Sequence, residues 1–546
     1  MTDTVTIPAT IHGLTYTQPM GTAKWFGHPS APFFAAEGIR SILENLGSRC
    51  FIVRDNKGAT GVAGSMGTDN PAELAQMELI ATLPAFEPEQ LGDPAFRETY
   101  GLQYNYMAGA MANGIASAEL VIALGKAGML GSFGAGGQVL SRIETAIDTI
   151  QAALPEGPYA VNLIHSPNEE ALERNGVDLF LRKGVRVIEA SAFLALTSHV
   201  VRYRVSGLSE NPDGSVHIGH RIIAKVSRLE VAAHFMQPAP ESFLKSLLHA
   251  GQITDEQARL AALVPMADDV TVEADSGGHT DNRSLVCLLP SVLNLRDQMQ
   301  QKFKFSQPVR IGAGGGIGTP EAVLAAFSMG AAYVVTGSVN QSCRESGSSD
   351  YVRKVLAQAD MTDIIMAPAA DMFEMGVKLQ VLKKGTLFGL RAQKLYDMYE
   401  SYNSWTEIPE KERANIEKNL LKGTFDDIWK HCVDFFQQRD PETLERAENN
   451  PKRKMALVFR WYLGLSSAWA NRGELGRELD YQIWCGPAMG AFNLWVKGTR
   501  LESWENRRVA DVGLQMLRGA AYLNRLQYLG MNRVQVGAEL RRVRVS

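Results

Sequence analysis

The sequence is poor in cysteine and has no long hydrophobic run. Its 546 residues include five cysteines, at positions 50, 287, 343, 432 and 485, and no C-x-x-C pair. This spacing argues against a disulfide framework or a compact zinc site, and it favours a reducing cytoplasm. No apolar run approaches the ~18 residues of a membrane span, and Met1–Thr4 lacks the layout of a signal peptide. We therefore expect a cytoplasmic protein without a metal site or a membrane segment.

An excess of one charge is also missing. The chain has 55 basic and 59 acidic residues, which give a formal net charge of −4. Proteins that bind nucleic acids usually carry a strong basic field, so we expect no nucleic-acid partner. Apolar residues make up 45% of the chain, enough for a substantial core and too many for extended disorder.

What the sequence does have is fifty glycines, several of them just after short apolar runs. Eight runs of about six residues are rich in valine and isoleucine, which is typical of parallel strands buried on both faces. Helical periodicity separates them, and eight such units over ~240 residues predict a (β/α)8 TIM barrel, with a doubly wound open sheet as the alternative. The predicted strands are Tyr104–Gly109, Met129–Gly134, Tyr159–Ile164, Val185–Ser191, Arg221–Ser227, Val270–Asp275, Pro308–Gly314 and Tyr333–Ser338. The predicted barrel helices are Ala116–Ala127, Gln138–Ala153, Glu169–Lys183 and Pro320–Met329.

The barrel accounts for residues 102–385, which leaves two flanking parts. Residues 1–101 are predicted to form a small α/β appendage. Residues 386–546 are predicted to form a helical domain, which holds seven of the eight tryptophans. The appendage has predicted helices at Ile39–Asn45 and at Pro71–Leu83, the latter capped by Asn70, and a predicted strand at Cys50–Val53.

Two insertions interrupt the barrel, and two helices are predicted after it. A β-hairpin is expected near 200–222, with arms at Val200–Leu208 and Ser215–Ile222 around the turn Asn211–Gly214. Extra helices are expected in 240–267. In the C-terminal domain, helical periodicity predicts helices at Phe425–Gln438 and Lys454–Ala470.

Two glycine-containing loops end the last two predicted strands. Gly312–Gly318 is followed by Thr319 and Pro320, which open a helix, and the eighth strand runs into Thr336–Ser338. Barrels often bind a phosphate at these two loops, because backbone N–H groups can approach an anion closely there. Neither a dinucleotide fingerprint nor a P-loop fits this spacing, so a mononucleotide cofactor or a phosphorylated substrate is favoured. A tight turn without a ligand is the alternative.

Three polar residues lie at the active end of the predicted strands. His279 follows Gly277 and Gly278 directly after strand six, where an imidazole could perform acid–base chemistry or serve a structural role. Asn162 on strand three needs a polar partner, either a flavin ring edge or a network at the barrel rim. Lys225 on strand five could face a ring carbonyl or pair with Glu273 or Glu189.

The strand-one sequence Met107–Met111 offers small residues and backbone groups to a flat ring, with ordinary strand packing as the alternative. The cysteines compete poorly for a catalytic role. Cys343 follows strand eight, but no basic partner is evident nearby in sequence.

These motifs, in this order, resemble the superfamily of nitronate monooxygenases and flavin-dependent enoyl-acyl-carrier-protein reductases over residues 102–345. The appendage, the hairpin around Pro212, Lys378–Ser401 and the tryptophan-rich tail resemble one branch, the PfaD family. Its members are stand-alone enoyl reductases of polyunsaturated fatty acid synthases and related trans-acting polyketide assembly lines.

The resemblance implies FMN as cofactor, NADPH or NADH as reductant and His279 as the catalytic residue near the substrate. It also implies reduction of the 2,3 double bond of an enoyl thioester on an acyl carrier protein, and a homodimer. The acidic carrier protein could dock on the helical domain and the basic C-terminal tail, or that domain could be a lid or a dimer interface. The cofactor-binding residues implied are Ala110, Met111, Asn162, Lys225, Gly278, Gly314, Gly315, Gly316, Gly337 and Ser338.

Three other functions remain open from the sequence. A nitronate monooxygenase would share the barrel motifs and use FMN with oxygen. A barrel isomerase or lyase without flavin would grip a substrate phosphate in the glycine loops. A non-catalytic subunit would keep the barrel as a docking scaffold.

Overall fold

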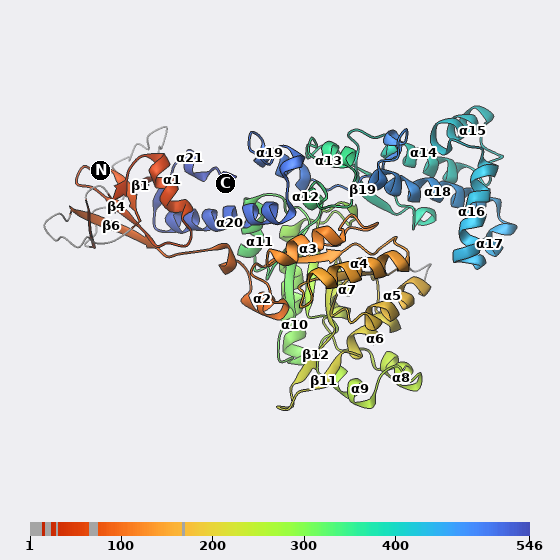
Figure 1. Ribbon diagram of the computed structural model, residues 1–546, viewed down its shortest axis with the longest axis horizontal. Helices are drawn as coiled ribbons and strands as arrows, with labels where there is room; N and C mark the ends of the chain where they lie inside the picture. The colour runs from red at the N-terminus through yellow and green to blue at the C-terminus, as the bar shows by residue number, and fades with distance from the viewer. Residues whose placement is uncertain (1–13, 17–22, 29–30, 65–74, 166–169, 546) are drawn as a thin grey trace, which may run out of the picture. The chain divides into compact units, whose positions relative to one another are not determined.

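The computed structural model describes residues 14–16, 23–28, 31–64, 75–165 and 170–545. Its contacts divide the chain into two compact units (Figure 1). The last part of the chain belongs to the same unit as the first part, whereas the sequence predicted a separate domain over residues 386–546. The first unit comprises Met1–Pro94, Thr319–Ser328 and Asp511–Ser546, and the second comprises Ala95–Gly318 and Met329–Ala510.

The second unit contains a closed barrel of eight parallel strands, which confirms the predicted TIM barrel. Each strand lies within its predicted run, except that β14 begins one residue earlier, at Asp269. Around the barrel the strands are β7 (Tyr106–Ala108), β8 (Leu130–Phe133), β9 (Ala160–Ile164), β10 (Val187–Ser191), β13 (Arg221–Val226), β14 (Asp269–Glu273), β16 (Arg310–Gly314) and β17 (Val334–Thr336).

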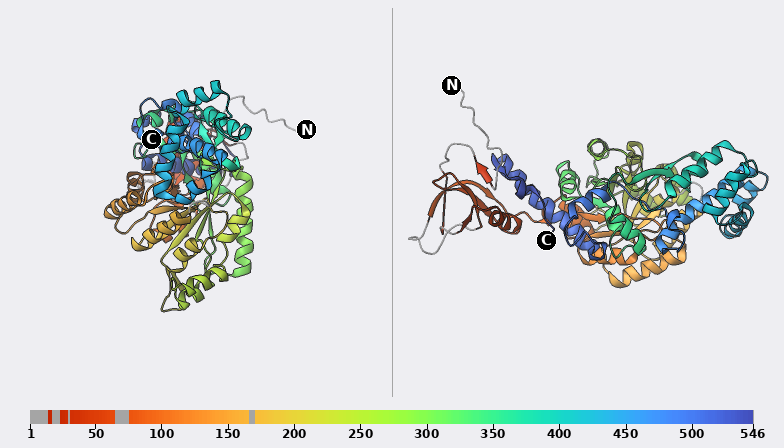
Figure 2. Two further views of the ribbon diagram at one scale, coloured as in Figure 1. Left: turned by 90° about the vertical axis from the view of Figure 1, so that its right-hand side faces the viewer. Right: turned by 90° about the horizontal axis from the view of Figure 1, so that it is seen from above.

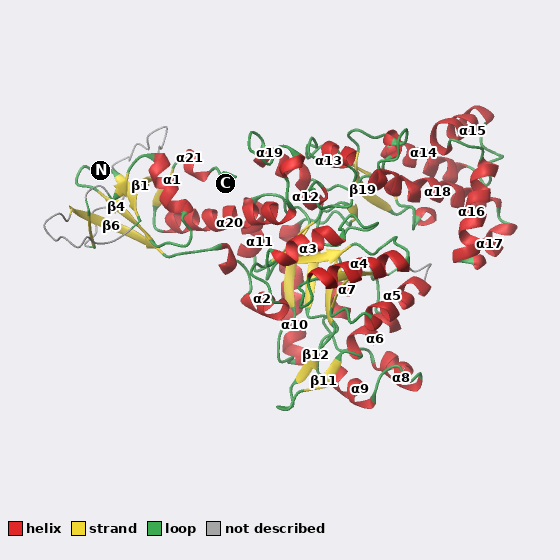
Figure 3. Ribbon diagram, in the orientation of Figure 1, coloured by secondary structure: helices red, strands yellow, loops and turns green. Residues whose placement is uncertain are grey.

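Helices follow the barrel strands, as the alternation predicted (Figure 3). Helix α3 shows why: Ser117 caps its N-terminus by accepting a hydrogen bond from the N–H of Leu120, and Leu120 and Leu124 are buried. The others are α4 (Leu140–Ala153), α5 (Glu170–Arg182), α6 (Ser198–Val205), α7 (Leu229–Phe235), α8 (Glu241–His249), α9 (Asp255–Ala261), α10 (Leu285–Phe303), α11 (Pro320–Ser328), α12 (Ser338–Gln341) and α13 (Asp350–Leu356), with α3 at Ala118–Lys126. The extra helices expected in 240–267 are α8 and α9.

The hairpin insertion is present but shorter than predicted. Its strands are β11 (Leu208–Glu210) and β12 (Val216–Ile218), joined through the turn Asn211–Gly214. The strand predicted over Val200–Leu208 is wrong, because most of that segment is helix α6. The Thr197 hydroxyl caps this helix, whose buried face outweighs the strand preference of its β-branched residues.

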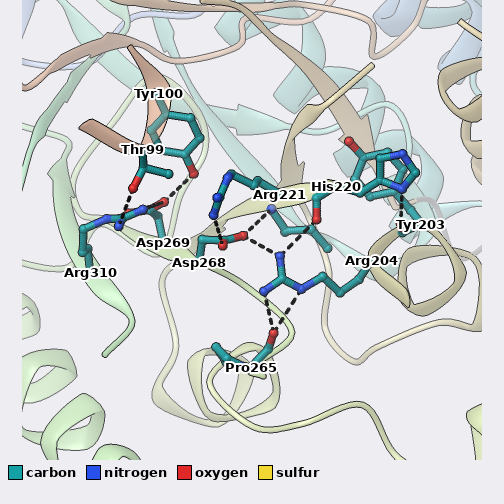
Figure 4. Close-up of polar contacts among 11 residues, drawn as sticks. Thr99, Tyr100, Tyr203, Arg204, His220, Arg221, Pro265, Asp268, Asp269 and Arg310 are labelled. Carbon is teal, nitrogen blue, oxygen red and sulfur yellow. Dashed lines mark hydrogen bonds and ion pairs between the residues drawn. The ribbon is translucent and has the colours of Figure 1, made fainter. Parts of the chain in front are cut away.

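The base of the barrel, where the strands begin, is closed by packing and ion pairs. Phe96, on helix α2 (Pro94–Tyr100), stacks on Tyr333 with ring centroids 4.0 Å apart. Asp269 at the start of β14 pairs with Arg310 at the start of β16, with Oδ1 2.7 Å from Nε (Figure 4). The neighbouring Asp268 pairs with Arg204 at 2.6 Å and with Arg221 at 2.8 Å.

A small antiparallel sheet lies beyond the barrel strands in the second unit. Strand β19 (Lys378–Leu382) is central and pairs with β18 (Ile364–Pro368) on one side and β15 (Gly278–His279) on the other. Helices dominate after it, and the two predicted helices correspond to α16 and α18. The helices from 386 onward are α14 (Phe388–Ser401), α15 (Glu410–Ile416), α16 (Phe425–Arg439), α17 (Pro441–Glu448), α18 (Pro451–Arg472), α19 (Ala488–Val496), α20 (Val509–Met531) and α21 (Ala538–Arg541).

The first unit is built on a seven-stranded sheet. It runs in the order β2 (Lys24–Gly27), β6 (Ala75–Leu83), β4 (Cys50–Arg54), β5 (Thr60–Ala63), β1 (Leu14–Tyr16) and β20 (Val534–Val536), and β3 (Pro32–Phe33) pairs with β5. Helix α1 (Ala36–Glu44) follows β3 and corresponds to the helix predicted at Ile39–Asn45. The part of α20 in this unit lies beside α1, where the side chain of Arg525 donates to the carbonyl of Leu43 (Figure 2).

The helix predicted at Pro71–Leu83 is wrong, since the described part of this segment is strand β6. It pairs with β2 and β4, and the alternate residues Met77 and Leu79 pack against the buried cluster around Trp25. This packing, with a period of two, outweighs the helix preference of its alanine, glutamate and leucine residues. Asn70 and Pro71 lie outside the described residues.

Across the described ranges, no helix has the combined length and hydropathy needed to cross a membrane. All five cysteines are free, and four of them are buried.

Candidate functional site

The predicted site residues lie at or just beyond the carboxyl ends of the barrel strands. Ala110 and Met111 follow β7, Asn162 lies in β9, Lys225 lies in β13 and Gly314 ends β16. Because all eight strands are parallel, these ends meet at the same rim of the barrel.

The glycine loops after β16 and β17 leave room for a ligand. A Cβ added to Gly316 or to Gly337 would meet no atom within 4 Å. Gly315 and Gly316 have φ angles of +85° and +73°, a conformation that glycine adopts without strain. A Cβ on Gly315 would also lie 2.6 Å from the backbone carbon of Ala274, so that only glycine fits there. We call these two loops, which follow the paired strands β16 and β17, the cup; at Gly316 and Gly337 no other described atom covers the backbone where a side chain would project.

A distant segment of the chain contacts this cup. The hydroxyl of Ser338 accepts a hydrogen bond of 3.0 Å from the N–H of Gly486. A Cβ on Gly277 would lie 2.7 Å from the nitrogen of Cys485, and one on Gly278 would lie 3.8 Å from Cγ of Trp484. The stretch Trp484–Gly486 therefore lies against both the β14 loop and the β17 loop.

A buried carboxylate, Glu189, organises the strand-one side of the site. Its side chain on β10 has no exposed surface, and Oε2 accepts a hydrogen bond of 2.7 Å from the N–H of Ala110. The amide of Asn162 on the neighbouring strand donates to the carbonyl of Glu189 at 3.0 Å and to the hydroxyl of Ser191 at 2.8 Å. Asn162 thus forms the rim network that was one of its two expected roles. Met111 lies in the same loop as Ala110, and its carbonyl accepts from the N–H of Ala116.

Lys225 pairs with Glu273 on the adjacent strand, with Nζ 3.0 Å from Oε1. Burial alone would lower the pKa of Lys225, but the charges of Glu273 and Glu189 raise this pKa above its ordinary value. Burial also raises the pKa of Glu189, although Lys225 and the N–H of Ala110 oppose this effect. Lys225 therefore pairs with Glu273, which was one of its expected alternatives, and the charge of Glu189 adds to the stabilisation of its ammonium group.

His279 lies in strand β15, above the end of β14. Its Nε2 is 3.1 Å from Oδ1 of Asp371, and its side chain is 44% exposed, so a ligand can reach the ring. The loop before it is fixed by Gln380, whose amide donates to Oδ1 of Asp275 and to the carbonyl of Ser276, both at 2.8 Å. Burial would lower the pKa of His279, but Asp371 and Glu273 outweigh it and raise this pKa above its ordinary value.

The described contacts thus arrange the predicted residues in three groups. Gly314, Gly315, Gly316, Gly337 and Ser338 form the cup. Ala110 and Asn162 hydrogen-bond to Glu189, Met111 follows Ala110, and Lys225 pairs with Glu273 on the adjacent strand. Gly278 and His279 lie in β15.

Residues 96–395, more than half of the chain, match the profile of the nitronate monooxygenase family. The chain belongs to this family. Residues 25–85 match the N-terminal domain of fatty acid synthase subunit PfaD, which confirms the predicted PfaD resemblance. Residues 402–481 match the inserted helical domain of [acyl-carrier-protein] S-malonyltransferase.

Proteins similar to this chain include components of biosynthetic synthases. The chain is 57% identical over 80% of its length to a component of the polyunsaturated fatty acid synthase of Thraustochytrium, of which it spans 30%. It is 46% identical over 83% of its length to the polyketide biosynthesis protein PksE of Bacillus subtilis, of which it spans 59%. The crystal structure of the enoyl reductase domain of MlnA, from the macrolactin cluster of Bacillus amyloliquefaciens, is 42% identical with a TM-score of 0.77. That match covers 81% of this chain and 99% of the MlnA domain. The family and the MlnA domain together indicate an oxidoreductase.

Three parts of this family member's site were not singled out from the sequence. Glu189 had a detectable signal, because it is a carboxylate inside the apolar run Val185–Ser191, but it was weighed only as a partner of Lys225. Asp371 and Trp484–Gly486 carry no local signal, since they reach the site from segments 92 and about 200 residues beyond His279.

Proposed function

We propose that the chain is an FMN-dependent enoyl reductase. It would use NAD(P)H to reduce the 2,3 double bond of an enoyl thioester on an acyl carrier protein, in polyunsaturated fatty acid or polyketide biosynthesis. The observation that carries this proposal is the open glycine cup at the ends of β16 and β17, with an exposed histidine after the adjacent strand β14. The names of the similar proteins point to the same chemistry.

The residues present fit FMN. The phosphate would lie in the cup, where Gly316 and Gly337 offer open space and backbone N–H groups could bind an anion. Ala110, Met111 and Asn162 would border the ring, and the ammonium group of Lys225 would supply positive charge beside it. When bound, FMN would accept a hydride from NAD(P)H and pass it to the β-carbon of the thioester.

His279 would supply the other half of the reduction. Saturation of the carbon–carbon double bond requires a hydride at the β-carbon and a proton at the α-carbon. A protonated imidazole can donate that proton and regain it from solvent. The side chains around it would contribute by holding the thioester and the imidazole in place.

The absorbance spectrum of the purified protein tests this proposal first. We expect a yellow protein that releases FMN on denaturation, is bleached anaerobically by NADPH or NADH, and is reoxidised by crotonyl thioester. A folded protein that neither carries nor takes up flavin would overturn the proposal and would favour a barrel enzyme acting on a phosphorylated substrate.

The second candidate function is a nitronate monooxygenase, which the family match supports directly. It predicts oxygen-dependent turnover of an alkyl nitronate without turnover of an enoyl thioester. Assaying the same flavin-loaded preparation with both substrates separates the two functions. A non-catalytic role would instead leave product formation by the assembly line unchanged when His279 is replaced by alanine.

An acyl carrier protein is the partner that we propose. The match of residues 402–481 to an insertion in an enzyme that acts on such a carrier supports it. The arginines of the basic C-terminal tail give this proposed partner less support than their number suggests. Arg507 and Arg525 are buried, and Arg544 pairs with Glu37. We expect a higher kcat/KM for acyl carrier protein thioesters than for coenzyme A thioesters, with a difference that shrinks as salt rises. The proposed homodimer is tested separately by sedimentation.

A further inference from the structure

His279 does not belong to a barrel strand but to the small sheet outside the barrel. Strand β15 pairs with β19 through Gly278 opposite Gln380 and His279 opposite Leu379, and β19 pairs with β18 along five residues. Asp371 comes three residues after the end of β18. One sheet therefore supports both members of the contact between Nε2 of His279 and Oδ1 of Asp371, which are 3.1 Å apart.

The Asp371 carboxylate is held in place from its own loop. Its Oδ1 also accepts a hydrogen bond of 3.1 Å from the N–H of Met372. The next residue, Phe373, is fully buried and packs against the rings of Tyr396 and Phe459. The loop closes where the N–H of Ala369 donates to the carbonyl of Val377 at 2.9 Å. Asp371 is thus fixed against the helical part of the chain and faces the histidine.

This geometry decides which ring nitrogen carries the proton. An ionised carboxylate can only accept hydrogen bonds, so Nε2 of His279 must be the donor and its N–H points at Asp371. Nδ1 makes no hydrogen bond to any side chain or backbone group in the part of the chain that the structure describes. It is the nitrogen left to face a substrate.

We infer that Asp371 is the positioning residue of the active site: it binds Nε2–H of His279 and so presents Nδ1 as the atom that delivers the proton to the α-carbon. The inference rests on the proposed enoyl reductase function. The barrel motifs do not contain this carboxylate, which the β18–β19 segment adds to the barrel.

The charges around His279 set the expected direction of its pH dependence. Burial and Lys225 disfavour the protonated ring, but Asp371 and Glu273 favour it more strongly, with a net rise in the pKa of His279. Burial would raise the pKa of Asp371, but His279 and Arg460 lower this pKa, so that the carboxylate stays ionised. Enoyl reduction that needs protonated His279 is fully supported below the pKa of His279 and is lost as pH rises through it. Removing the charge of Asp371 moves that loss to lower pH.

The test compares Asp371→Asn with Glu374→Gln in the flavin-loaded full chain. Glu374 lies in the same segment between β18 and β19, but its carboxylate pairs with Arg460, at 3.3 Å, and not with His279. Glu374→Gln therefore removes one negative charge, as Asp371→Asn does, without removing the partner of His279. We expect Asp371→Asn to lower kcat for crotonyl thioester about tenfold at neutral pH, with little change in KM. In the pH profile of kcat, the alkaline limb of Asp371→Asn should move to lower pH. The kcat of Glu374→Gln should stay within about twofold of the wild-type value. In a protein that already carries His279→Gln, adding Asp371→Asn should not lower kcat further.

A second measurement does not depend on turnover. The NMR signals of labelled histidine report the protonated nitrogen and the pKa of His279 among the ten histidines, and His279→Gln assigns them. We expect an Nε2–H tautomer in the wild type, and a lower pKa in Asp371→Asn only. An unchanged pKa and pH profile in Asp371→Asn would overturn the inference. A wild-type protein that reduces no enoyl thioester, yet shows the expected NMR signals, would overturn the proposed function instead.

Discussion

Gly315 and Gly337 of the cup differ in the space that a side chain would find at each position. Gly315 has φ +85°, and an added Cβ would meet the backbone of Ala274 at 2.6 Å. Gly337 has a negative φ of −129°, and an added Cβ would meet open space. Contacts within the chain therefore exclude a side chain at Gly315, whereas a methyl group added at Gly337 would meet only an occupant of the cup.

The pair Gly315→Ala and Gly337→Ala tests this distinction. We expect Gly315→Ala to lower the free energy of unfolding by about 2 kcal/mol, through backbone strain and the contact with Ala274. Gly337→Ala should change stability by less than about 0.5 kcal/mol but reduce bound FMN, since the methyl group enters the cup. Denaturant unfolding and flavin content per chain measure the two effects. Wild-type flavin content in Gly337→Ala would contradict the proposed phosphate site.

Some site residues could be predicted from the sequence because their signal is local. The glycines after the last two strands and His279 after Gly278 stand directly at strand ends, where barrel enzymes place their chemistry. Asp371 could not be predicted this way. Its carboxylate reaches His279 through the pairing of β18, β19 and β15, which is a long-range contact with no short motif.

At the scale of elements, burial decides which predictions succeed. The eight barrel strands are buried on both faces, and a run such as Ala160–Ile164 has no helical alternative of that length. Strand β6 has helix-favouring residues and becomes a strand only because β2 and β4 flank it. Helix α6 shows the reverse, since Val200, Val201 and Val205 favour a strand but are buried on a capped helix.

Arg525 links two elements of the first unit that lie far apart in the sequence. This buried side chain on α20 donates to backbone carbonyls at and beyond the C-terminus of α1, among them Leu43 at 3.1 Å and Leu46 at 2.8 Å. It also donates to the carbonyl of Pro84 at 3.0 Å. The carbonyl of Leu43 lies in the last turn of α1, where helix carbonyls lack a partner within the helix, so the guanidinium group of Arg525 stabilises that end. The carbonyl of Leu46 also accepts from the N–H of Phe86.

We therefore expect Arg525→Ala to destabilise the first unit by about 3 kcal/mol, because it removes the donor of the buried Leu43 carbonyl and several further hydrogen bonds. Arg525→Lys should recover part of this loss, since an ammonium group keeps the charge but not the planar fork. Amide hydrogen exchange in α1 and β4 should accelerate in Arg525→Ala. The control is Arg518→Ala, an exposed arginine on the same helix, which should exchange like the wild type. Equal protection in both variants would contradict this role.

At the scale of the barrel as a whole, stability and chemistry are assigned to opposite ends. The proposed site occupies the carboxyl ends of the strands, where the buried charge of Lys225 and the left-handed backbone of Gly315 lie. The amino ends carry buried ion pairs, with Asp269 fully buried and Arg310 7% exposed (Figure 4). Barrels commonly separate the two tasks in this way, because loops at one end can vary while the other end keeps the strands in register.

This separation makes the ion pair at the base a test of the fold that spares the site. Arg310→Ala leaves Asp269 buried without its cation, so we expect a loss of about 3–5 kcal/mol in the free energy of unfolding. Arg182→Ala removes a pair with Glu144 in which the arginine is 62% exposed, and it should cost less than about 1 kcal/mol. Replacing both partners, as Arg310→Met with Asp269→Leu, should restore part of the loss because no unpaired charge remains buried. The folded fraction of each variant should keep the wild-type pH profile of turnover. A profile altered by Arg310→Ala would mean that the two ends are coupled, and stability equal to that of Arg182→Ala would mean that the buried pair contributes no more than an exposed one.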